Sequence, residues 1–531
     1  MRNFHYPGRS TAYAGEAMVA TSSSFASIAA LDVLKRGGNA MDAAVTASAV
    51  LCVAEPHMTG IGGDCFALIG EPDGTVKGLN ASGRASARAD ADWLKGAGLE
   101  AGIGEKGIHS VTVPGAIDGW DRLLKAHGTM GLKEALAPAI KLARDGVPTT
   151  PRVAYDWARH AAALSEDEGG RLHFLPGGRA PRAGEVVRYP AFADTLEAIA
   201  KGGRDAFYSG PIAEEMVSVL GARGALLTLE DYRAAEADWV EPISTTFEDH
   251  DILEIPPSGQ GIVALAALNI LKRLDIGRFA PDSPERYHLQ TEAIRLAFVL
   301  RARHVADPAH ADVPQAWMLS DALADELASR IDVSRAIADV GGAVPRKHSD
   351  TIYLCVVDRN RLAVSFINSV YAAWGTMIVL PRAGFALHNR GSSFSTDPAH
   401  PNCIGPRKRP MHTIIPAMAR KGGRVAMPFG VMGGDYQPMG QVQVALNMLV
   451  YGMDPQEALD FPRFFPEPDT GLLTVEQSVP EPVCKALEAR GHRLSSLAEP
   501  LGGGQAIAID WGSGVLSGGS DPRKDGLALG Y

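Results

Sequence analysis

The chain has 531 residues, of which 46% are hydrophobic and 21% are charged, and it contains 58 Gly and 35 Pro. This length exceeds that of a usual single core, so we expect two lobes or one large layered domain. A net charge of −10 argues against nucleic acid or an anionic membrane as a partner.

Targeting and membrane signals are missing from the sequence. No run of about 18 apolar residues occurs, so we expect no transmembrane helix. Residues 1–9 lack the apolar core of a secretory signal. The five cysteines lack the spacing of pairs, which suits a reducing compartment: Cys52, Cys65, Cys355, Cys403 and Cys484. We therefore expect a cytoplasmic protein.

The first part of the chain predicts mostly helices. Residues 24–35 have apolar side chains at helical spacing and are followed by a Gly-Gly pair. Asn39 then caps a second predicted helix, residues 40–54, which is apolar on almost every face and ends before Pro56. Residues 60–68 read as a glycine-rich turn that leads into a strand. From about residue 116 to residue 330 helical patterns dominate.

Strand patterns dominate after residue 350. Thr351 opens an apolar, β-branched run, residues 358–361 form a polar turn, and residues 362–367 continue as a second strand. This pattern predicts a hairpin whose first strand opens on a small hydroxyl residue. Residues 411–420 and 424–431 predict two more strands, and residues 441–451 predict a helix.

Thr351 stands at the point where the character of the chain changes. A hydroxyl is a weak nucleophile unless a base lies beside it. A threonine freed at its N-terminus carries its own base, because the pKa of an α-amino group is about 8. Taken alone, a threonine that opens a strand is usually an ordinary packing residue.

Four stretches of the sequence, in order and at matching spacing, resemble the γ-glutamyltranspeptidase superfamily of N-terminal-nucleophile hydrolases over nearly the whole chain. They are residues 37–45 continued by 53–64, the hairpin at Asp350-Thr351 with Trp374-Gly375-Thr376 after it, Lys408-Arg409-Pro410 followed by Gly433-Gly434, and residues 519–526 continued to Gly530-Tyr531.

The resemblance implies an α+β fold, a four-layer αββα sandwich, and the strand-rich centre with flanking helices fits it. It also implies that the precursor cuts itself between Asp350 and Thr351. The products would be a large subunit, residues 1–350, and a small catalytic subunit, residues 351–531, which form a heterodimer. A dimer of such heterodimers is compatible with the resemblance, and the implied partner is a small-molecule amide substrate.

Four catalytic residues follow from the resemblance. Thr351 matches the nucleophile of the family. Ser369, 18 positions later, matches a second hydroxyl that hydrogen-bonds the nucleophile. Gly433 and Gly434 match a turn whose backbone N–H groups bind the oxyanion, and glycine permits the close approach. The alternative interpretations are an ordinary strand-end serine and an ordinary glycine turn.

The acyl pocket departs from the γ-glutamyl pattern in its arginine. The arginine expected after the first strands is displaced by about two positions, to Arg84. A second arginine, Arg390, follows Asn389 in the stretch of residues 389–394. Either arginine could bind a substrate carboxylate bidentately, and the alternative is a structural or surface arginine.

Four other pocket positions also differ from the γ-glutamyl pattern. Ser393 stands at the acidic position, His412-Thr413 replaces a Ser-Ser pair, and Tyr371 replaces an asparagine. Losing the acidic residue removes the group that would offset a buried substrate ammonium. The loop of residues 396–405 is also shorter than the lid of many transpeptidases, which favours hydrolysis over transfer.

No metal or cofactor motif was found. The sequence has no Cys-x-x-Cys or His-Glu-x-x-His, and residues 256–261 lack the lysine of a phosphate-binding loop. The resemblance therefore implies a threonine amidohydrolase that needs no cofactor. The cytoplasmic start, residues 389–394 and the missing acidic residue resemble the oxamate amidohydrolase-like branch, which implies hydrolysis of a small, carboxylate-bearing amide such as oxamate. The alternatives are a γ-glutamyltransferase or glutathione hydrolase, a glutaryl acylase of the cephalosporin type, and an unprocessed, inactive scaffold or binding protein.

Overall fold

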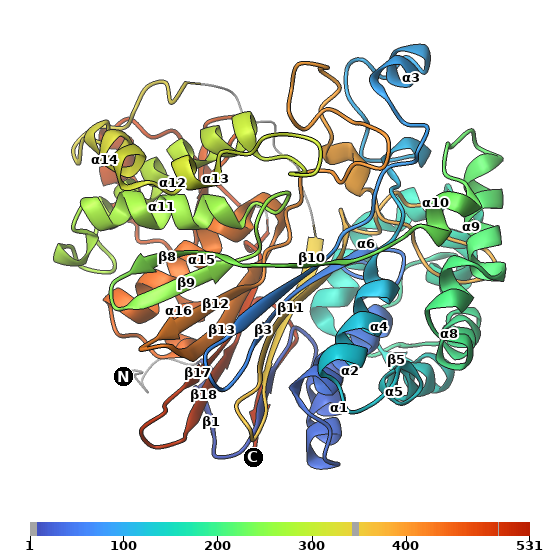
Figure 1. Cartoon of the computed structure of the whole chain (residues 1–531). Helices are drawn as coiled ribbons and strands as arrows, with labels where there is room; N and C mark the ends of the chain where they lie inside the picture. Colours follow the sequence, from blue (N-terminus) through green and yellow to red (C-terminus); the bar gives the residue numbers. More distant parts are fainter. Residues whose placement is uncertain (1–7, 342–349, 498) are drawn as a thin grey trace.

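Two seven-stranded antiparallel sheets lie face to face at the centre of the computed structural model, which describes residues 8–341, 350–497 and 499–531 (Figure 1). The first sheet has the order β1 (Ala12–Ala14), β18 (Leu516–Ser520), β17 (Gly503–Ile509), β13 (Arg424–Met432), β12 (Ala417–Lys421), β9 (His250–Glu254) and β8 (Ile243–Phe247). The second has the order β19 (Ala528–Gly530), β2 (Met18–Ala20), β10 (Asp350–Val357), β11 (Ala363–Tyr371), β3 (Asp64–Gly70), β4 (Val76–Ala81) and β7 (Asp238–Val240).

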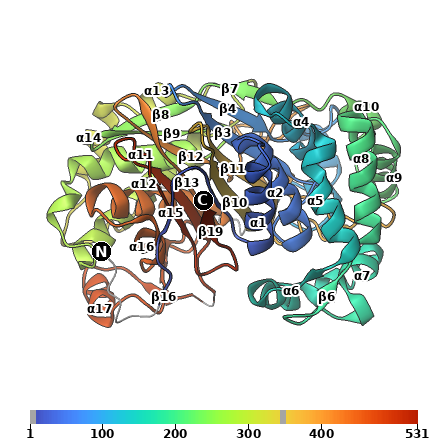
Figure 2. The same cartoon turned by 90° about the horizontal axis from the view of Figure 1, so that it is seen from below.

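Helices cover the outer face of each sheet, so the predicted αββα sandwich is confirmed (Figures 1 and 2). On the side of the second sheet lie α1 (Ser24–Lys35), α2 (Ala40–Ala54), α4 (Ala116–His127), α5 (Leu132–Asp145), α6 (Pro151–Leu164), α7 (Glu168–Phe174), α8 (Pro190–Tyr208), α9 (Pro211–Gly221) and α10 (Leu229–Arg233). On the side of the first lie α11 (Gly261–Arg273), α12 (Pro284–His304), α13 (Gln315–Met318), α14 (Asp321–Ser329), α15 (Gln437–Ala445), α16 (Pro455–Asp460) and α17 (Glu481–Ala489).

Smaller elements decorate the sandwich. They are α3 (Ala91–Gly96), the strand pair β5 (Val147–Pro148) and β6 (Val186–Val187), and a three-stranded sheet of β14 (Phe464–Pro466), β15 (Leu473–Val475) and β16 (Leu494–Ser496). Within the described ranges, no helix is both long and apolar enough to cross a bilayer.

The predicted buried helix, α2, begins with a capping box. The Asn39 side chain accepts hydrogen bonds from the backbone N–H groups of Met41 and Asp42, and the Asp42 carboxylate accepts one from Asn39 N–H. These bonds satisfy donors that the first helical turn leaves without partners. Every residue of α2 is buried, because the helix lies between the second sheet and the outer helices α1 and α5.

Two predicted elements differ from the observed ones. The strand predicted at residues 411–420 begins only at Ala417, because His412 N–H donates to the Ser258 carbonyl and Pro416 has no N–H to give. The helix predicted at residues 441–451 begins earlier, at Gln437, and ends in a π-helical turn, Leu446–Val450.

The contact between the two sheets sets the direction of β10 relative to β13. A Cβ atom on Gly430 of β13 would lie 2.5 Å from the Tyr353 ring of β10, so only glycine fits there. The Ser365 hydroxyl, opposite Cys355 in the hairpin, lies 3.4 Å from the Phe429 carbonyl. The start of β10 and the end of β13 therefore lie on the same side of the contact between the sheets. This arrangement brings the start of the hairpin toward the turn that follows β13.

Candidate functional site

Thr351 lies at an irregularity of the central hairpin. Asp350 pairs with Tyr371, and Ile352 pairs with Asn368, so the register shifts across Thr351. The Thr351 side chain is fully buried, and its hydroxyl lies 3.0 Å from the Ser369 hydroxyl. The Ser369 oxygen also accepts a hydrogen bond of 2.8 Å from Tyr371 N–H. The two hydroxyls that the sequence singled out are thus brought into hydrogen-bond contact.

The glycine turn after β13 is held by buried side chains. Gly433 has φ 121° and Gly434 has φ 59°, which are conformations that glycine adopts without strain. The Gln260 side-chain amide donates to the Gly434 carbonyl and to the Thr413 carbonyl, both at 2.9 Å. Such bonds fix the plane of the peptide group and therefore the direction of the neighbouring N–H groups.

Arg390 is fully buried and only partly paired. Its Nη1 donates to the Thr413 hydroxyl at 2.9 Å, and its Cζ lies 3.9 Å from the centroid of the Tyr371 ring. Among the described residues, Nε and Nη2 have no hydrogen-bond partner. Burial lowers the pKa of Arg390 to about 10, so the group remains charged at neutral pH. A buried cation with two unused donors is suited to binding an anionic ligand.

Asp64 is a buried carboxylate of this region, and both of its oxygens already have partners. Oδ1 accepts from the backbone N–H groups of Gly83 and Gly115 at 3.0 and 3.1 Å, and Oδ2 lies 3.1 Å from His412 Nε2 and 3.5 Å from His388 Nδ1. Burial favours its neutral form, but the two imidazoles and the Arg390 guanidinium lower the pKa of Asp64 to about 2.

The two histidines stay neutral. Burial, together with the nearby Arg390 charge, lowers the pKa of His412 to about 3, and burial also lowers the pKa of His388. His412 therefore acts as a neutral donor to Asp64 and adds no charge. The cluster thus holds one negative charge, on Asp64, and one positive charge, on Arg390, whose donors are incompletely paired.

Arg84 lies in a different environment from Arg390. Its side chain is 28% exposed, and its guanidinium pairs with Asp238 at 3.1 Å and lies 3.8 Å from Asp307. It also donates to the Arg407 carbonyl at 3.2 Å and lines a separate cavity of about 240 Å³. Its charge is already neutralised by carboxylates of the protein, so the structure favours Arg390 over Arg84 as the partner of a substrate carboxylate.

Asn389 and Ser393 have different surroundings. The Asn389 side chain accepts from Ala372 N–H at 3.0 Å and donates to the Glu105 carbonyl at 2.8 Å, so it fixes the loop after β11. Ser393 lines a cavity of about 620 Å³ together with Arg301, Ser392, Phe394, Asn402 and Met411. Two of its lining residues, Ser392 and Ser393, follow Arg390 closely in the sequence. The cavity is large enough for a small organic molecule.

Sequence reasoning missed three of the supports of this region. They are Asp64, which lies in the first matched stretch, His388 and Gln260, to which the sequence pattern assigns no role. Arg301 also pairs with Asp435 at 2.6 Å, directly after the glycine turn. A charged residue that opens a fully apolar strand, as Asp64 does, was the signal available in the sequence, since a buried charge needs partners.

The sequence profile of the family described as gamma-glutamyltranspeptidase matches residues 26–531. The glutathione hydrolase-like YwrD proenzyme of Bacillus subtilis is 38% identical over 97% of this chain and 98% of its own length. The oxamate amidohydrolase proenzyme of Klebsiella pneumoniae is 36% identical over 95% of this chain and 97% of its own.

A solved structure agrees with these matches over the whole chain. The crystal structure of cephalosporin acylase from Bacillus halodurans superposes with a TM-score of 0.93 at 40% identity, covering 100% of this chain and 99% of that one. The expected superfamily is therefore confirmed. The chain is an enzyme and belongs to the gamma-glutamyltranspeptidase family of N-terminal-nucleophile hydrolases.

Proposed function

We propose that this chain is an autoprocessed threonine amidohydrolase that hydrolyses a small amide whose acyl part carries a carboxylate, with oxamate-like compounds favoured. The observation that carries the proposal is the buried Arg390 guanidinium, which has two donors without partners in the described structure and lies in the cluster built around Asp64. Because Thr351, Ser369 and the glycine turn are all retained, an inactive scaffold is disfavoured.

Maturation begins inside the intact chain. The Thr351 hydroxyl oxygen attacks the carbonyl carbon of Asp350 and the C–N bond breaks. The nitrogen takes up the hydroxyl proton in addition to its own and becomes the free amine of Thr351. The resulting ester is then hydrolysed by water, which leaves a carboxylate on Asp350 and a hydroxyl on Thr351. The 3.0 Å contact with Ser369 supports this step, because a neighbouring hydroxyl can orient the attacking oxygen.

The mature enzyme uses the same hydroxyl on its substrate. The free amine of Thr351 takes the hydroxyl proton, and the oxygen attacks the amide carbon of the substrate. The N–H groups of the turn at Gly433 and Gly434 stabilise the oxyanion, ammonia or an amine leaves with the proton, and water hydrolyses the acyl-enzyme. The products of the precursor are residues 1–350 and 351–531, a large and a small subunit that stay together.

Substrate choice follows from the charges of the pocket. Arg390 attracts a carboxylate, and the Asp64 carboxylate is already occupied by two backbone N–H groups and the imidazoles. Ser393 cannot balance an ammonium as an acidic residue would. An acyl group with a carboxylate and no α-ammonium therefore fits better than a γ-glutamyl group. The unpaired state of all five cysteines supports a cytoplasmic location for this reaction.

A second candidate substrate has its own observation. The cavity of about 620 Å³ beside Ser393 exceeds the needs of oxamate, and Phe394 and Met411 give part of it an apolar lining. A glutaryl-type amide with a larger leaving group would use that space.

The test is a side-by-side measurement of kcat/KM with oxamate, glutaryl-anilide, glutathione and a γ-glutamyl anilide, read by release of ammonia, amine or glutamate. We expect oxamate or glutaryl-anilide to exceed both γ-glutamyl substrates. Faster turnover of the γ-glutamyl compounds, with efficient transfer to dipeptides, would contradict this proposal. It would identify a transpeptidase that binds the γ-glutamyl group through a different set of residues.

A further inference from the structure

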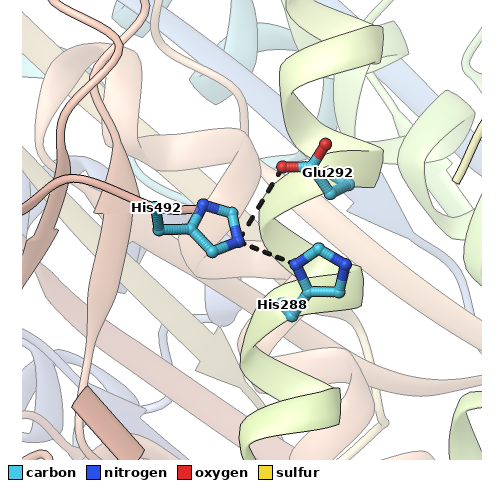
Figure 3. A group of neighbouring side chains, drawn as sticks. All are labelled: His288, Glu292 and His492. Carbon is cyan, nitrogen blue, oxygen red and sulfur yellow. Dashed lines mark hydrogen bonds and ion pairs between the residues drawn. The ribbon is translucent and has the colours of Figure 1, made fainter. Parts of the chain in front are cut away.

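Two histidines and a glutamate from distant parts of the chain meet in a buried cluster outside the proposed active site (Figure 3). His288 and Glu292 lie one turn apart on α12, and His492 lies between α17 and β16. His288 Nδ1 lies 2.7 Å from His492 Nε2, which in turn lies 3.9 Å from Glu292 Oε1. The two histidines are 204 positions apart in the sequence, so spacing alone could not reveal them.

Hydrogen bonds assign the tautomer of His288. Its Nε2 lies 2.8 Å from the Asp332 carbonyl oxygen, which can only accept, so Nε2 carries the proton. Nδ1 therefore presents a lone pair to the other two side chains. This arrangement, a ring N–H bound to a carbonyl behind and a free nitrogen in front, is typical of metal-ligating histidines.

The two rings face each other nitrogen to nitrogen at 2.7 Å, so a proton or a cation must lie between these atoms.

We propose that His288 Nδ1, His492 Nε2 and Glu292 Oε1 bind a divalent transition-metal ion of the zinc class. Two imidazole nitrogens and one carboxylate oxygen form a donor set that Zn²⁺ accepts. Bond lengths of about 2.0–2.1 Å in a tetrahedron place donors about 3.3 Å apart. The 2.7 Å pair must open and the 3.9 Å pair must close by about 0.6 Å each. The third pair, His288 and Glu292, lies within 4.8 Å and must close by up to about 1.5 Å.

Glu292 remains available as a ligand despite its other contacts. Arg295 Nη1 donates to Oε1 at 2.7 Å, and Ile337 N–H donates to Oε2 at 2.9 Å. Each carboxylate oxygen has two lone pairs, so each keeps one. These bonds orient the carboxylate toward the histidines, as outer hydrogen bonds do around metal ligands.

The ion would join the two fragments of the proposed precursor. His288 and Glu292 belong to residues 1–350, and His492 belongs to residues 351–531. The same cluster anchors the chain that leads toward the proposed cleavage point, because His288 binds the Asp332 carbonyl and Glu292 binds Ile337 N–H. The role assigned to the metal is therefore structural. Only this joining role depends on the proposed cleavage, and metal binding by the three side chains does not.

The experiment uses the full chain without a polyhistidine tag, stripped with a chelator and then titrated with Zn²⁺ or Co²⁺. Metal content, the ligand-field absorption of Co²⁺ and the unfolding temperature are measured. The variants are Glu292→Gln, which keeps the shape of the side chain, and His492→Asn. His304→Gln, on the same helix but outside the cluster, is the matched control.

We expect one ion per chain, a tetrahedral Co²⁺ spectrum and a higher unfolding temperature with Zn²⁺. Each cluster variant should weaken binding by at least about tenfold, and the control should not. Failure of the wild type to take up stoichiometric metal, or equal binding by Glu292→Gln and wild type, would overturn the proposal. The three side chains would then be a hydrogen-bonded network only. Amidase activity and processing are not readouts, so this result is independent of the proposed function.

Discussion

The Arg390 guanidinium stacks on the Tyr371 ring, with 3.9 Å between Cζ and the ring centroid. Tyr371 has φ 78°, a left-handed conformation that costs free energy for a residue with a side chain. It is the last residue of β11, two positions after Ser369, and faces Asp350 across the hairpin. The stack thus links the proposed carboxylate-binding group to the strand end that supports the proposed nucleophile.

Arg390 should be needed for turnover and Arg84 should not. Replacing Arg390 by Met should cost roughly 2–5 kcal/mol in kcat/KM for a carboxylate-bearing amide, because a buried charge pair with the substrate is lost. Arg84→Met is the matched control, since that arginine already pairs with Asp238. Arg390→Lys should recover little, because a point charge cannot replace the bidentate fork.

Steady-state kinetics with oxamate and with its uncharged methyl ester would decide the matter. The loss at Arg390 should be large for the acid and small for the ester. An equal loss for both compounds, or a larger loss at Arg84, would contradict the assignment. Processing between Asp350 and Thr351 should survive both changes, since the substrate of that step is the chain itself.

Self-cleavage should depend on Thr351. Wild type should mature into fragments that end at Asp350 and begin at Thr351, whereas Thr351→Ala should remain a chain of 531 residues, because no hydroxyl is left for the acyl shift. Thr470→Ala, which removes an exposed hydroxyl, is the control and should mature normally. Intact-mass measurement checks both, and a new N-terminus at any other residue would refute the prediction.

The freed amine of Thr351 should act as the general base. Activity should fall on the acid side of an apparent pKa of about 7–8, because the protonated amine cannot accept the hydroxyl proton. Selective acetylation of this amine, verified by peptide mass, should abolish turnover while the hydroxyl remains. Full activity of the acetylated enzyme would assign the base to another residue.

Asp64 should contribute stability that depends on pH. Its pKa in the folded protein is about 2, below the ordinary value of about 3.9 in the unfolded chain. A depressed folded pKa gives stability that is complete above pH 4 and is lost as the pH falls through about 2. The difference in unfolding free energy between wild type and Asp64→Asn should therefore be on the order of 2 kcal/mol at pH 7 and shrink toward pH 3.

Denaturant unfolding of the Thr351→Ala background at several pH values measures this difference. That background keeps one covalent chain, so the two proteins are compared in the same state. A difference that stays constant between pH 7 and pH 3 would mean that Asp64 is not the ionised group.

The sequence predicted the layers well because their signals are local. The cap at Asn39 and the all-apolar run after it identify a buried helix, and the β-branched run after Thr351 identifies a strand. The strand expected from residue 411 was too long, because a contact between His412 and Ser258, distant in sequence, takes its hydrogen bond. Long-range contacts of this kind leave no local pattern.

The candidate site was predictable in its residue types but not in its charges. The resemblance to the family pairs Thr351 with Ser369, and the structure places their hydroxyl oxygens 3.0 Å apart. Arg84 and Arg390 looked equivalent in sequence, and only their neighbours distinguish them, since one meets two carboxylates and the other has open donors. The choice between them depends on which charges the fold has already compensated.

The order of strands in the second sheet determines how the two fragments of the cleaved protein would dissociate. β10 and β11 lie between β2 on one side and β3 on the other, so strands from before and after Thr351 are interleaved within one hydrogen-bonded sheet. After cleavage at Thr351, neither fragment can dissociate without breaking the backbone hydrogen bonds between strands of this sheet. Unfolding would then release two separate molecules, and recovery would require them to find each other again. Heat resistance of the cut form should thus rise with protein concentration, whereas that of the uncut precursor should not.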